Sequence, residues 1–246
     1  MLVLTLLFSI ILKTTCQIIT LNENDITIRG PINSESTNKF FDDIKNIEGD
    51  INIFINSPGG SVIDGIKIIN HINMLKHEGH SINCVVDYAA SMAFIILQSC
   101  TNRYALSSAV LMQHQMSLGT KGSLYNIKNY LKMIDDLDLY LEKLQSDRIN
   151  MSLSSFSQLI QNDWWLLGNE ALKINVVDKL VFVKCNKKLY TQRDKITYNT
   201  FFGDVTLEYS KCPLIRKHNK IHYHSEDNKT EISNLIEEKF YPNYLN

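Results

Sequence analysis

The sequence predicts an α/β fold in which parallel strands are joined by helices. Short apolar runs that end at Gly, Pro or Ser alternate with longer stretches whose apolar residues recur at helical spacing. Strands that alternate with helices in this way form βαβ units. A length of 246 residues, 44% of them hydrophobic, suits one domain of ordinary size with an appendage. The net charge of −1 gives no overall field that attracts nucleic acid, so no nucleic-acid partner is expected.

The pattern in the first part of the chain predicts a strand, a helix and a second strand. Alternating isoleucines predict a strand at residues 25–29, which ends at Gly30-Pro31. A helix is expected at 34–47, where apolar residues line one face and Ser36 is the predicted N-cap. The apolar run at 51–55 predicts the next strand.

The central part continues the same alternation. A sharp turn at 57–60 leads into a helix at 62–75, which is followed by a strand at 82–86. A further helix is expected to begin at 91–97, and a strand at 109–113 follows it.

The last predicted elements include an unusually long helix. Apolar residues keep helical spacing over 124–149 with charged residues between them, and a helix of this length is expected to project from the body. A short helix at 168–174 and a last strand at 176–183 complete the expected core. After about residue 184 the chain becomes more charged and less periodic. We therefore divide it into an apolar leader (1–16), a catalytic-type domain (17–184) and a polar C-terminal extension of unknown role (185–246).

The leader resembles the apolar region of a secretory signal peptide. Residues 1–12 are almost wholly apolar, but they are fewer than the roughly 20 that a membrane-spanning helix needs. Thr14 and Cys16 flank a candidate cleavage point, although no Lys or Arg precedes the apolar run. A cleaved signal and a retained anchor both stay open. The location is secretory or membrane-associated if the leader is a signal, and otherwise cytoplasmic or organellar.

The cysteines and histidines give two further expectations. Cys84 and Cys100 lie in apolar segments and are expected to be buried, inert thiols, whereas Cys185 and Cys212 can pair in an oxidising compartment. The tail also carries four side chains of the types that bind zinc, at spacings compatible with a zinc site: Cys212, His218, His222 and His224. No compact CxxC spacing supports such a site, so we predict a solvated polar segment and no metal.

Three segments carry the residues of acyl-transfer chemistry. Ser91 follows two alanines and opens a helix, where its hydroxyl is accessible and the helix N-terminus favours developing negative charge. His114, at a strand end, is a candidate base. Gly60 has no side chain to block a carbonyl, so its N–H and that of Met92 are candidate donors to an oxyanion.

These segments resemble the proteolytic subunit of the Clp protease family over about residues 25–180. The motifs that carry the resemblance are Ile55-Asn56-Ser57-Pro58-Gly59-Gly60-Ser61, Ala89-Ala90-Ser91-Met92, Leu111-Met112-Gln113-His114-Gln115 and Asn162-Asp163-Trp164-Trp165-Leu166. The resemblance implies a ClpP/crotonase-like fold, an α/β spiral of βαβ units in which residues 124–149 form a protruding handle helix.

The resemblance also implies the roles of individual residues. Ser91 falls on the nucleophile, His114 on the general base and Asp163 on the carboxylate that orients the base. Gly60 and Met92 fall on the oxyanion donors. The implied activity is a serine endopeptidase that hydrolyses peptide bonds through an acyl-enzyme.

The implied assembly is a homo-oligomeric ring whose chamber receives peptides or unfolded proteins. A partner AAA+ Clp ATPase would use the ATP, because the chain has no G-x-x-x-x-G-K-[ST] loop, and no cofactor is expected in the chain itself. Asn162 stands where the family commonly has an Arg that takes part in contacts between rings. The ring size is therefore left open.

Three alternative functions remain at this point. A membrane or secretory peptidase of the signal-peptide-peptidase A type would explain the leader, but it uses a Lys as base. A crotonase-like acyl-CoA enzyme would use the two N–H donors without Ser91. An inactive subunit of a mixed ring is the third alternative, because the Gly that the family usually has after Met92 is missing and Ala93 follows directly.

Overall fold

The computed structural model describes residues 17–45, 47–200, 203–215, 220–223 and 230. The strands are β1 (Gln17–Leu21), β2 (Ile26–Arg29), β3 (Ile51–Ser57), β4 (Ile82–Ala90), β5 (Asn102–Gln113), β6 (Trp164–Leu167), β7 (Lys179–Cys185), β8 (Arg193–Thr200), β9 (Gly203–Ser210) and β10 (Lys220–Tyr223). The helices are α1 (Ser34–Ile44), α2 (Val62–His77), α3 (Met92–Ser99), α4 (Leu124–Ile149), α5 (Leu153–Ile160), α6 (Gly168–Lys173) and α7 (Lys187–Thr191).

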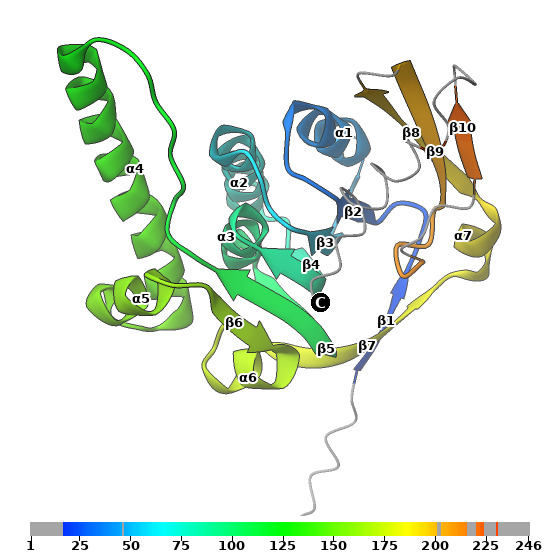
Figure 1. The fold of residues 1–246 in the computed structure, drawn as a ribbon. Helices are drawn as coiled ribbons and strands as arrows, with labels where there is room; N and C mark the ends of the chain where they lie inside the picture. Colours follow the sequence, from blue (N-terminus) through cyan, green and yellow to red (C-terminus); the bar gives the residue numbers. More distant parts are fainter. Residues whose placement is uncertain (1–16, 46, 201–202, 216–219, 224–229, 231–246) are drawn as a thin grey trace, which may run out of the picture.

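The main sheet is parallel and curled, in the order β1-β7-β5-β4-β3-β2, and β6 pairs with β5 in the antiparallel direction (Figure 1). Helices α1, α2 and α3 connect successive parallel strands, as βαβ units require. This confirms the predicted α/β spiral of the ClpP type. Figure 1 also shows α4 projecting from the body, as the sequence predicts for residues 124–149.

The two faces of the sheet bury two hydrophobic clusters. Successive strand residues point to opposite faces, so Ile53 and Ile55 join the larger cluster while Phe54 joins the smaller one. The larger cluster packs the sheet against α1, α2 and α3. The smaller cluster is covered from the other side by Leu189 of α7 and by Cys212.

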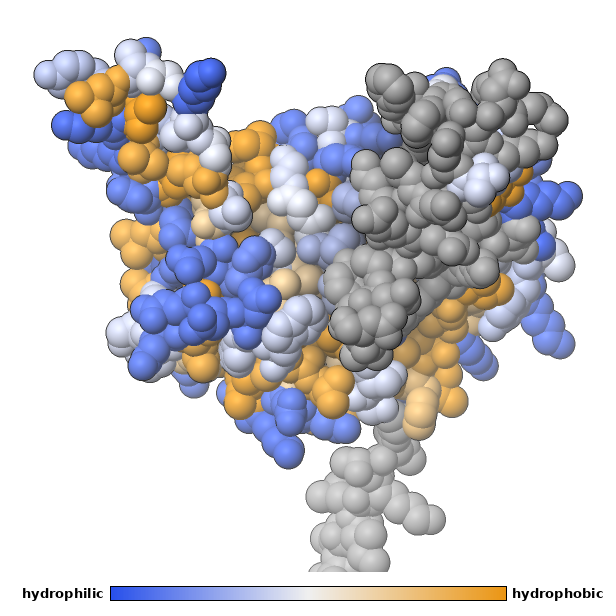
Figure 2. All heavy atoms as spheres, viewed as in Figure 1, coloured by the Kyte–Doolittle hydropathy of each residue, from blue (hydrophilic) through white to orange (hydrophobic). Residues whose placement is uncertain are grey.

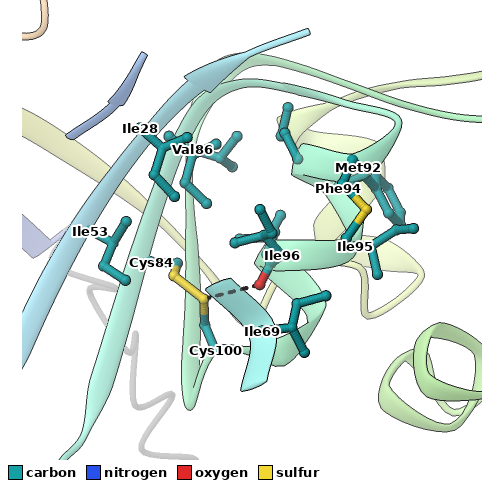
Figure 3. Packing of buried hydrophobic residues seen from close by; sticks show 14 of the residues in the cluster. Ile28, Ile53, Ile69, Cys84, Val86, Met92, Phe94, Ile95, Ile96 and Cys100 are labelled. Atoms are coloured by element: carbon teal, nitrogen blue, oxygen red, sulfur yellow. Dashed lines mark hydrogen bonds between the residues drawn. A yellow bond between two sulfur atoms is a disulfide. The ribbon is translucent and has the colours of Figure 1, made fainter. Parts of the chain in front are cut away.

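Helix α3 lies entirely inside the larger cluster. All eight of its residues are buried, and Figure 3 shows Met92, Phe94 and Ile96 of this helix among strand residues of the core. A helix that is apolar on every side is stable only when it is surrounded in this way. The residue that begins α3 is therefore held by a fixed scaffold.

The four cysteines in the described part of the chain form two disulfides. The sequence-based prediction of inert thiols at Cys84 and Cys100 is wrong, because these residues are bonded to each other (Figure 3). The prediction treated the two segments separately, whereas β4 and the end of α3 bring the sulfurs together in the core. The pairing that the sequence allows for Cys185 and Cys212 is present.

The region after β7 has more structure than its composition indicates. The sequence predicts little periodic structure there, but α7 and a three-stranded antiparallel sheet, β10-β9-β8, follow the main sheet. The Cys185–Cys212 disulfide joins the end of β7 to the segment that follows β9. Leu189, Cys212, Leu214 and Ile215 of this region thus pack on the second face of the main sheet.

One smaller correction concerns the start of α1, and one further finding concerns membrane segments. The N-cap of α1 is Asn33, and Ser36 is its reciprocal partner in a capping box. No helix in the described part of the chain combines the length and the apolarity that crossing a bilayer requires. The apolar leader lies outside the described residues.

Candidate active site

Ser91 lies at the sharp junction between β4 and α3. Its backbone φ of 53° and ψ of −124° are sparsely populated for a residue with a side chain. Its N–H donates to the carbonyl of Met112 at 2.9 Å, which fixes it beside the end of β5. Ser91 is the N-cap residue of α3, but its hydroxyl makes no capping hydrogen bond. The hydroxyl is therefore available for chemistry, on a half-buried residue.

Gly59 packs directly against this junction. A Cβ at Gly59 would lie 2.5 Å from the carbonyl oxygen of Ala90 and 2.8 Å from both the nitrogen of Met92 and the Cβ of Ser91. With a φ of +86°, the position favours glycine in conformation as well as in space. The turn after β3 therefore lies against the first residues of α3.

The peptide between Gly59 and Gly60 has a defined direction. The carbonyl of Gly59 accepts from the N–H of Ile32 at 2.8 Å, and the N–H of Ser61 donates to the carbonyl of Ile32 at 2.8 Å. In a trans peptide the N–H points opposite to the C=O, so the N–H of Gly60 is directed away from Ile32. Because β3 lies between β2 and β4, this direction is the side of Ser91.

Met92 contributes a second N–H at the same place. It is the first residue of α3, and the N–H groups of a first turn have no acceptor within their own helix. Its side chain is buried and packs over Gly65 of α2, where a Cβ would clash with it. The positive end of the α3 dipole lies at this position and favours negative charge.

His114 directly follows β5 and is anchored on both sides. The preceding residue, Gln113, is buried and accepts from the N–H of His114 through Oε1 at 3.3 Å. The following residue, Gln115, donates its backbone N–H to the carbonyl of Ile160 at 2.9 Å and its side-chain amide to Gln161 at 3.0 Å. The half-buried His114 is thus held between two fixed residues.

Asp163 directly precedes β6. Gln113 pairs with Trp164 in the antiparallel β5–β6 ladder, so the next step of the same register sets His114 opposite Asp163. Asp163 is exposed, and the neighbouring Trp164 packs against Phe94 of α3 and Phe156 of α5. These ring contacts tie the segment of Asp163 to the helix that Ser91 begins.

The structure thus brings the five predicted residues to one end of the sheet. Neighbouring strands β4 and β5 end just before Ser91 and His114, and β6 begins after Asp163. The turn after β3 supplies Gly60 on the side of Met92. Among the described residues, no side-chain hydrogen bond joins Ser91, His114 and Asp163. Catalytic hydrogen bonds are often long without substrate and shorten when it binds.

An ionic network around the buried Arg103 fixes the far end of β5. Arg103 is 1% exposed and binds Asp178 through three nitrogens, with the shortest contact at 2.5 Å, while Arg148 of α4 contacts the same carboxylate at 3.2 Å. Burial alone raises the pKa of Asp178, but its hydrogen bonds with Arg103 and the charges of both arginines outweigh burial and hold the pKa below its ordinary value. This network joins β5, β7 and α4.

Sequence reasoning missed the residues that hold His114. It assigned no role to Gln113 or to Gln145, which is the buried partner of Gln113 on α4. A buried Gln that directly follows the apolar run at residues 109–112 of the strand is the signal that could have pointed to Gln113.

The tail residues considered for zinc do not form a described metal site. Cys212 is bonded to Cys185 and is not available as a thiolate, and His222 contacts Glu208 at 3.1 Å. His218 and His224 lie outside the described residues. No group of three or more metal-type ligands occurs among the residues that the structure describes.

Comparisons with known proteins identify the family of this chain. The family model described as Clp protease matches residues 13–184, which include β1 to β6, all of β7 except its last residue, and all five predicted site residues. The ATP-dependent Clp protease proteolytic subunit 2 of Synechococcus sp. (strain CC9605) is 30% identical over 168 residues, which cover 65% of this chain and 84% of that protein. Together with the curled parallel sheet, these matches show that the chain belongs to the Clp protease family.

Proposed function

We propose that this chain is a serine endopeptidase that cuts peptides or unfolded proteins through an acyl-enzyme. Family membership supports a peptidase. The observation that carries the serine mechanism is the convergence of Ser91, His114 and Asp163 at the ends of three paired strands. A Ser-His-Asp peptidase uses this combination of nucleophile, base and orienting carboxylate.

In the first step, the Oγ of Ser91 attacks the substrate carbonyl and transfers its proton to His114. Asp163 orients the imidazole and stabilises the imidazolium that forms. The N–H groups of Gly60 and Met92 donate to the oxyanion, and stabilisation of this kind is usually the largest electrostatic contribution.

Collapse of the intermediate then breaks the C–N bond, and His114 gives its proton to the leaving amine. A water molecule attacks the resulting ester while His114 takes up its proton, and that proton returns to Ser91 as the acid product leaves. The proposed chemistry uses only this chain's residues and water. ATP would be used by an AAA+ partner that unfolds and delivers the substrate.

The proposed quaternary structure is a ring of identical chains, and the exposed side of α4 supports it. The projecting part of this helix carries large side chains that are exposed to solvent: Leu124, Tyr125, Tyr130, Leu131, Met133, Leu139 and Tyr140. Figure 2 shows orange, hydrophobic residues among blue ones on this projecting part. A cluster of exposed apolar residues of this kind marks an interaction surface. Neighbouring chains would cover it and enclose a chamber.

The test is labelling of the purified full chain with a fluorophosphonate probe, with the adduct located by mass spectrometry and the particle mass recorded on the same sample. We expect the adduct on Ser91 and none in Ser91→Ala, which should fold normally because only a small hydroxyl is removed. A well-assembled particle without any adduct would refute the proposal and favour the inactive ring subunit.

The base is tested by the peptidase rates of single and double variants. His114→Ala should lose nearly as much hydrolysis as Ser91→Ala. The double variant should be little worse than either single variant, because residues of a triad act as a unit. Hydrolysis that persists in His114→Ala would contradict the assignment of His114 as the general base.

A further inference from the structure

Two buried glutamines connect α4 to the residue proposed as the base. Gln113 is 2% exposed at the end of β5, and Gln145 is 1% exposed on the inner side of α4. The Nε2 of Gln113 donates to the Oε1 of Gln145 at 2.5 Å. Neighbouring inward positions on both elements are apolar, for example Leu111 on β5 and Ile149 on α4. The pair therefore replaces apolar packing by a directional contact.

The hydrogen bonds of this pair run in one continuous series. The Nε2 of Gln145 donates to the carbonyl of Leu141 at 2.9 Å, which leaves the Oε1 of Gln145 to accept from Gln113. The Oε1 of Gln113 in turn accepts from the backbone N–H of His114 at 3.3 Å. Each amide uses one donor and one acceptor, so the series links the backbone of α4 to the backbone of His114.

We propose that Gln113 and Gln145 are positioning residues that align His114 with respect to Ser91 and make this alignment depend on where α4 lies. The inference rests on the proposed function for its catalytic meaning. A buried amide that loses its partner is costly, so the two side chains hold each other in one orientation. A displacement of α4 would then pull on Gln113 and on the N–H of His114.

The size of the expected effect follows from the geometry that proton transfer needs. A base has to lie within hydrogen-bond reach of the hydroxyl, and a displacement of about 1 Å can lower a rate by up to about 100-fold. The remaining anchor, at Gln115, would limit the displacement. We therefore expect a loss of about tenfold when the series is removed.

The first measurement is amide hydrogen exchange at His114 in the full, unmodified chain. The proposal requires that this N–H exchange at least about tenfold more slowly than in an unstructured peptide. This result needs neither a variant nor an active enzyme. Exchange at the unstructured rate would overturn the proposal.

The second measurement uses Gln113→Met/Gln145→Met, which keeps the size of both side chains and removes the polar pair together. Replacing both partners by apolar groups of similar shape is nearly neutral for stability, so the variant should melt within a few degrees of the original chain. We expect exchange at His114 to accelerate about tenfold. The limiting rate of fluorophosphonate labelling should fall about tenfold, with the half-saturating probe concentration unchanged.

Gln98→Met is the matched control. Gln98 is equally buried and binds Val176 and Arg103, away from His114. This variant should melt at a lower temperature while the exchange at His114 and the labelling rate of its folded fraction stay unchanged. A general loss of packing would affect both variants alike.

The outcomes separate the two proposals. If the original chain is labelled at Ser91 and the double variant matches it in rate and exchange, the positioning role is wrong and the proposed function stands. If the original chain is not labelled, the proposed function fails, and the exchange at His114 still decides whether the two glutamines hold this residue.

Discussion

Gln113 and Trp164 form the last residue pair of the antiparallel ladder between β5 and β6. The residues just outside this pair are His114 and Asp163, so the geometry of a short ladder sets the separation of the proposed base and its carboxylate. The first residue after β4, Ser91, is tied to β5 by its own N–H. The relative positions of the three residues are therefore set by backbone hydrogen bonds rather than by contacts among their side chains.

The contact of Gly59 with the Ser91 junction predicts that a methyl group added at residue 59 will lower both the stability of the fold and the labelling of Ser91. In Gly59→Ala the added Cβ would meet backbone atoms of Ala90 and Met92 and the Cβ of Ser91, so the start of α3 must move. We expect a loss of more than about 2 kcal/mol of stability, since strain of the left-handed backbone alone costs about 1–2 kcal/mol. Labelling of Ser91 should fall by at least about 100-fold, because a small misplacement has effects of this size.

Gly79→Ala is the control for Gly59→Ala. Gly79 has a similar φ of +97°, but nothing lies within 4 Å of its added Cβ. This variant should lose only the stability that strain of the left-handed backbone costs, and it should keep the labelling rate. Equal labelling of the two variants would contradict the proposed packing at Ser91.

The ion pairs of Asp178 predict how stability depends on pH. The pKa of Asp178 is lower in the folded chain than its ordinary value of about 4. A lowered pKa stabilises the fold above that ordinary value, and the contribution is lost as the pH falls through the folded pKa. The melting temperature should therefore fall as the pH drops from about 5 to about 3.

The variant Asp178→Asn isolates this contribution. It should melt well below the original chain at pH 7, because Arg103 is left buried without its carboxylate, and its melting temperature should depend less on pH below about 4. Asp43→Asn removes an exposed carboxylate next to Lys39 and should follow the original curve. Parallel curves for Asp178→Asn and the original chain would contradict the prediction.

The two disulfides are expected to contribute similar stability. They join residues 16 and 27 positions apart, and loops of this size correspond to about 3 kcal/mol each in the chain-entropy model. We expect Cys84→Ala/Cys100→Ala and Cys185→Ala/Cys212→Ala each to lose about this amount in denaturant unfolding. Peptide mapping without reductant checks the pairing itself, and free thiols at these four positions would contradict it.

The exposed apolar residues of α4 predict an effect on assembly. Tyr125 is 77% exposed at the projecting end, so Tyr125→Lys would place a charge in any interface formed there. We expect the particle mass to shift towards the single chain without a change in melting temperature of the isolated subunit. Asn126→Lys adds the same charge at the next exposed position and provides the matched control.

The regular part of the fold could be predicted because each βαβ unit carries its own pattern. The strands and helices from residue 51 to 97 follow from local periodicity and from the break at Ser57-Pro58-Gly59-Gly60. Strand β1 was missed because its partner, β7, is far away in the sequence and Ile18 remains 59% exposed, so no local pattern marks it. The four residues of β6 are likewise too few to show a period.

The candidate site was predictable to a different degree at each residue. Ser91 and Gly60 lie in turns whose small residues indicate their proposed roles. The proposed role of Asp163 came only from the family resemblance, and the register of β6 now sets this residue opposite His114. The Gln113–Gln145 contact and the Cys84–Cys100 bond join residues that only the folded chain brings together. Pairings of this kind depend on tertiary structure and leave no local trace in the sequence.

The pairing of β1 with β7 has a consequence for the order of events on the ribosome. Gln17 pairs with Val181 and Leu21 with Cys185. The first strand therefore cannot pair until nearly the whole domain has been synthesised. The edge of the sheet stays open during that interval, and Asp163 also emerges late. The residues of the proposed triad thus cannot all be in place early in translation, and we expect the proposed peptidase activity only when synthesis is well advanced.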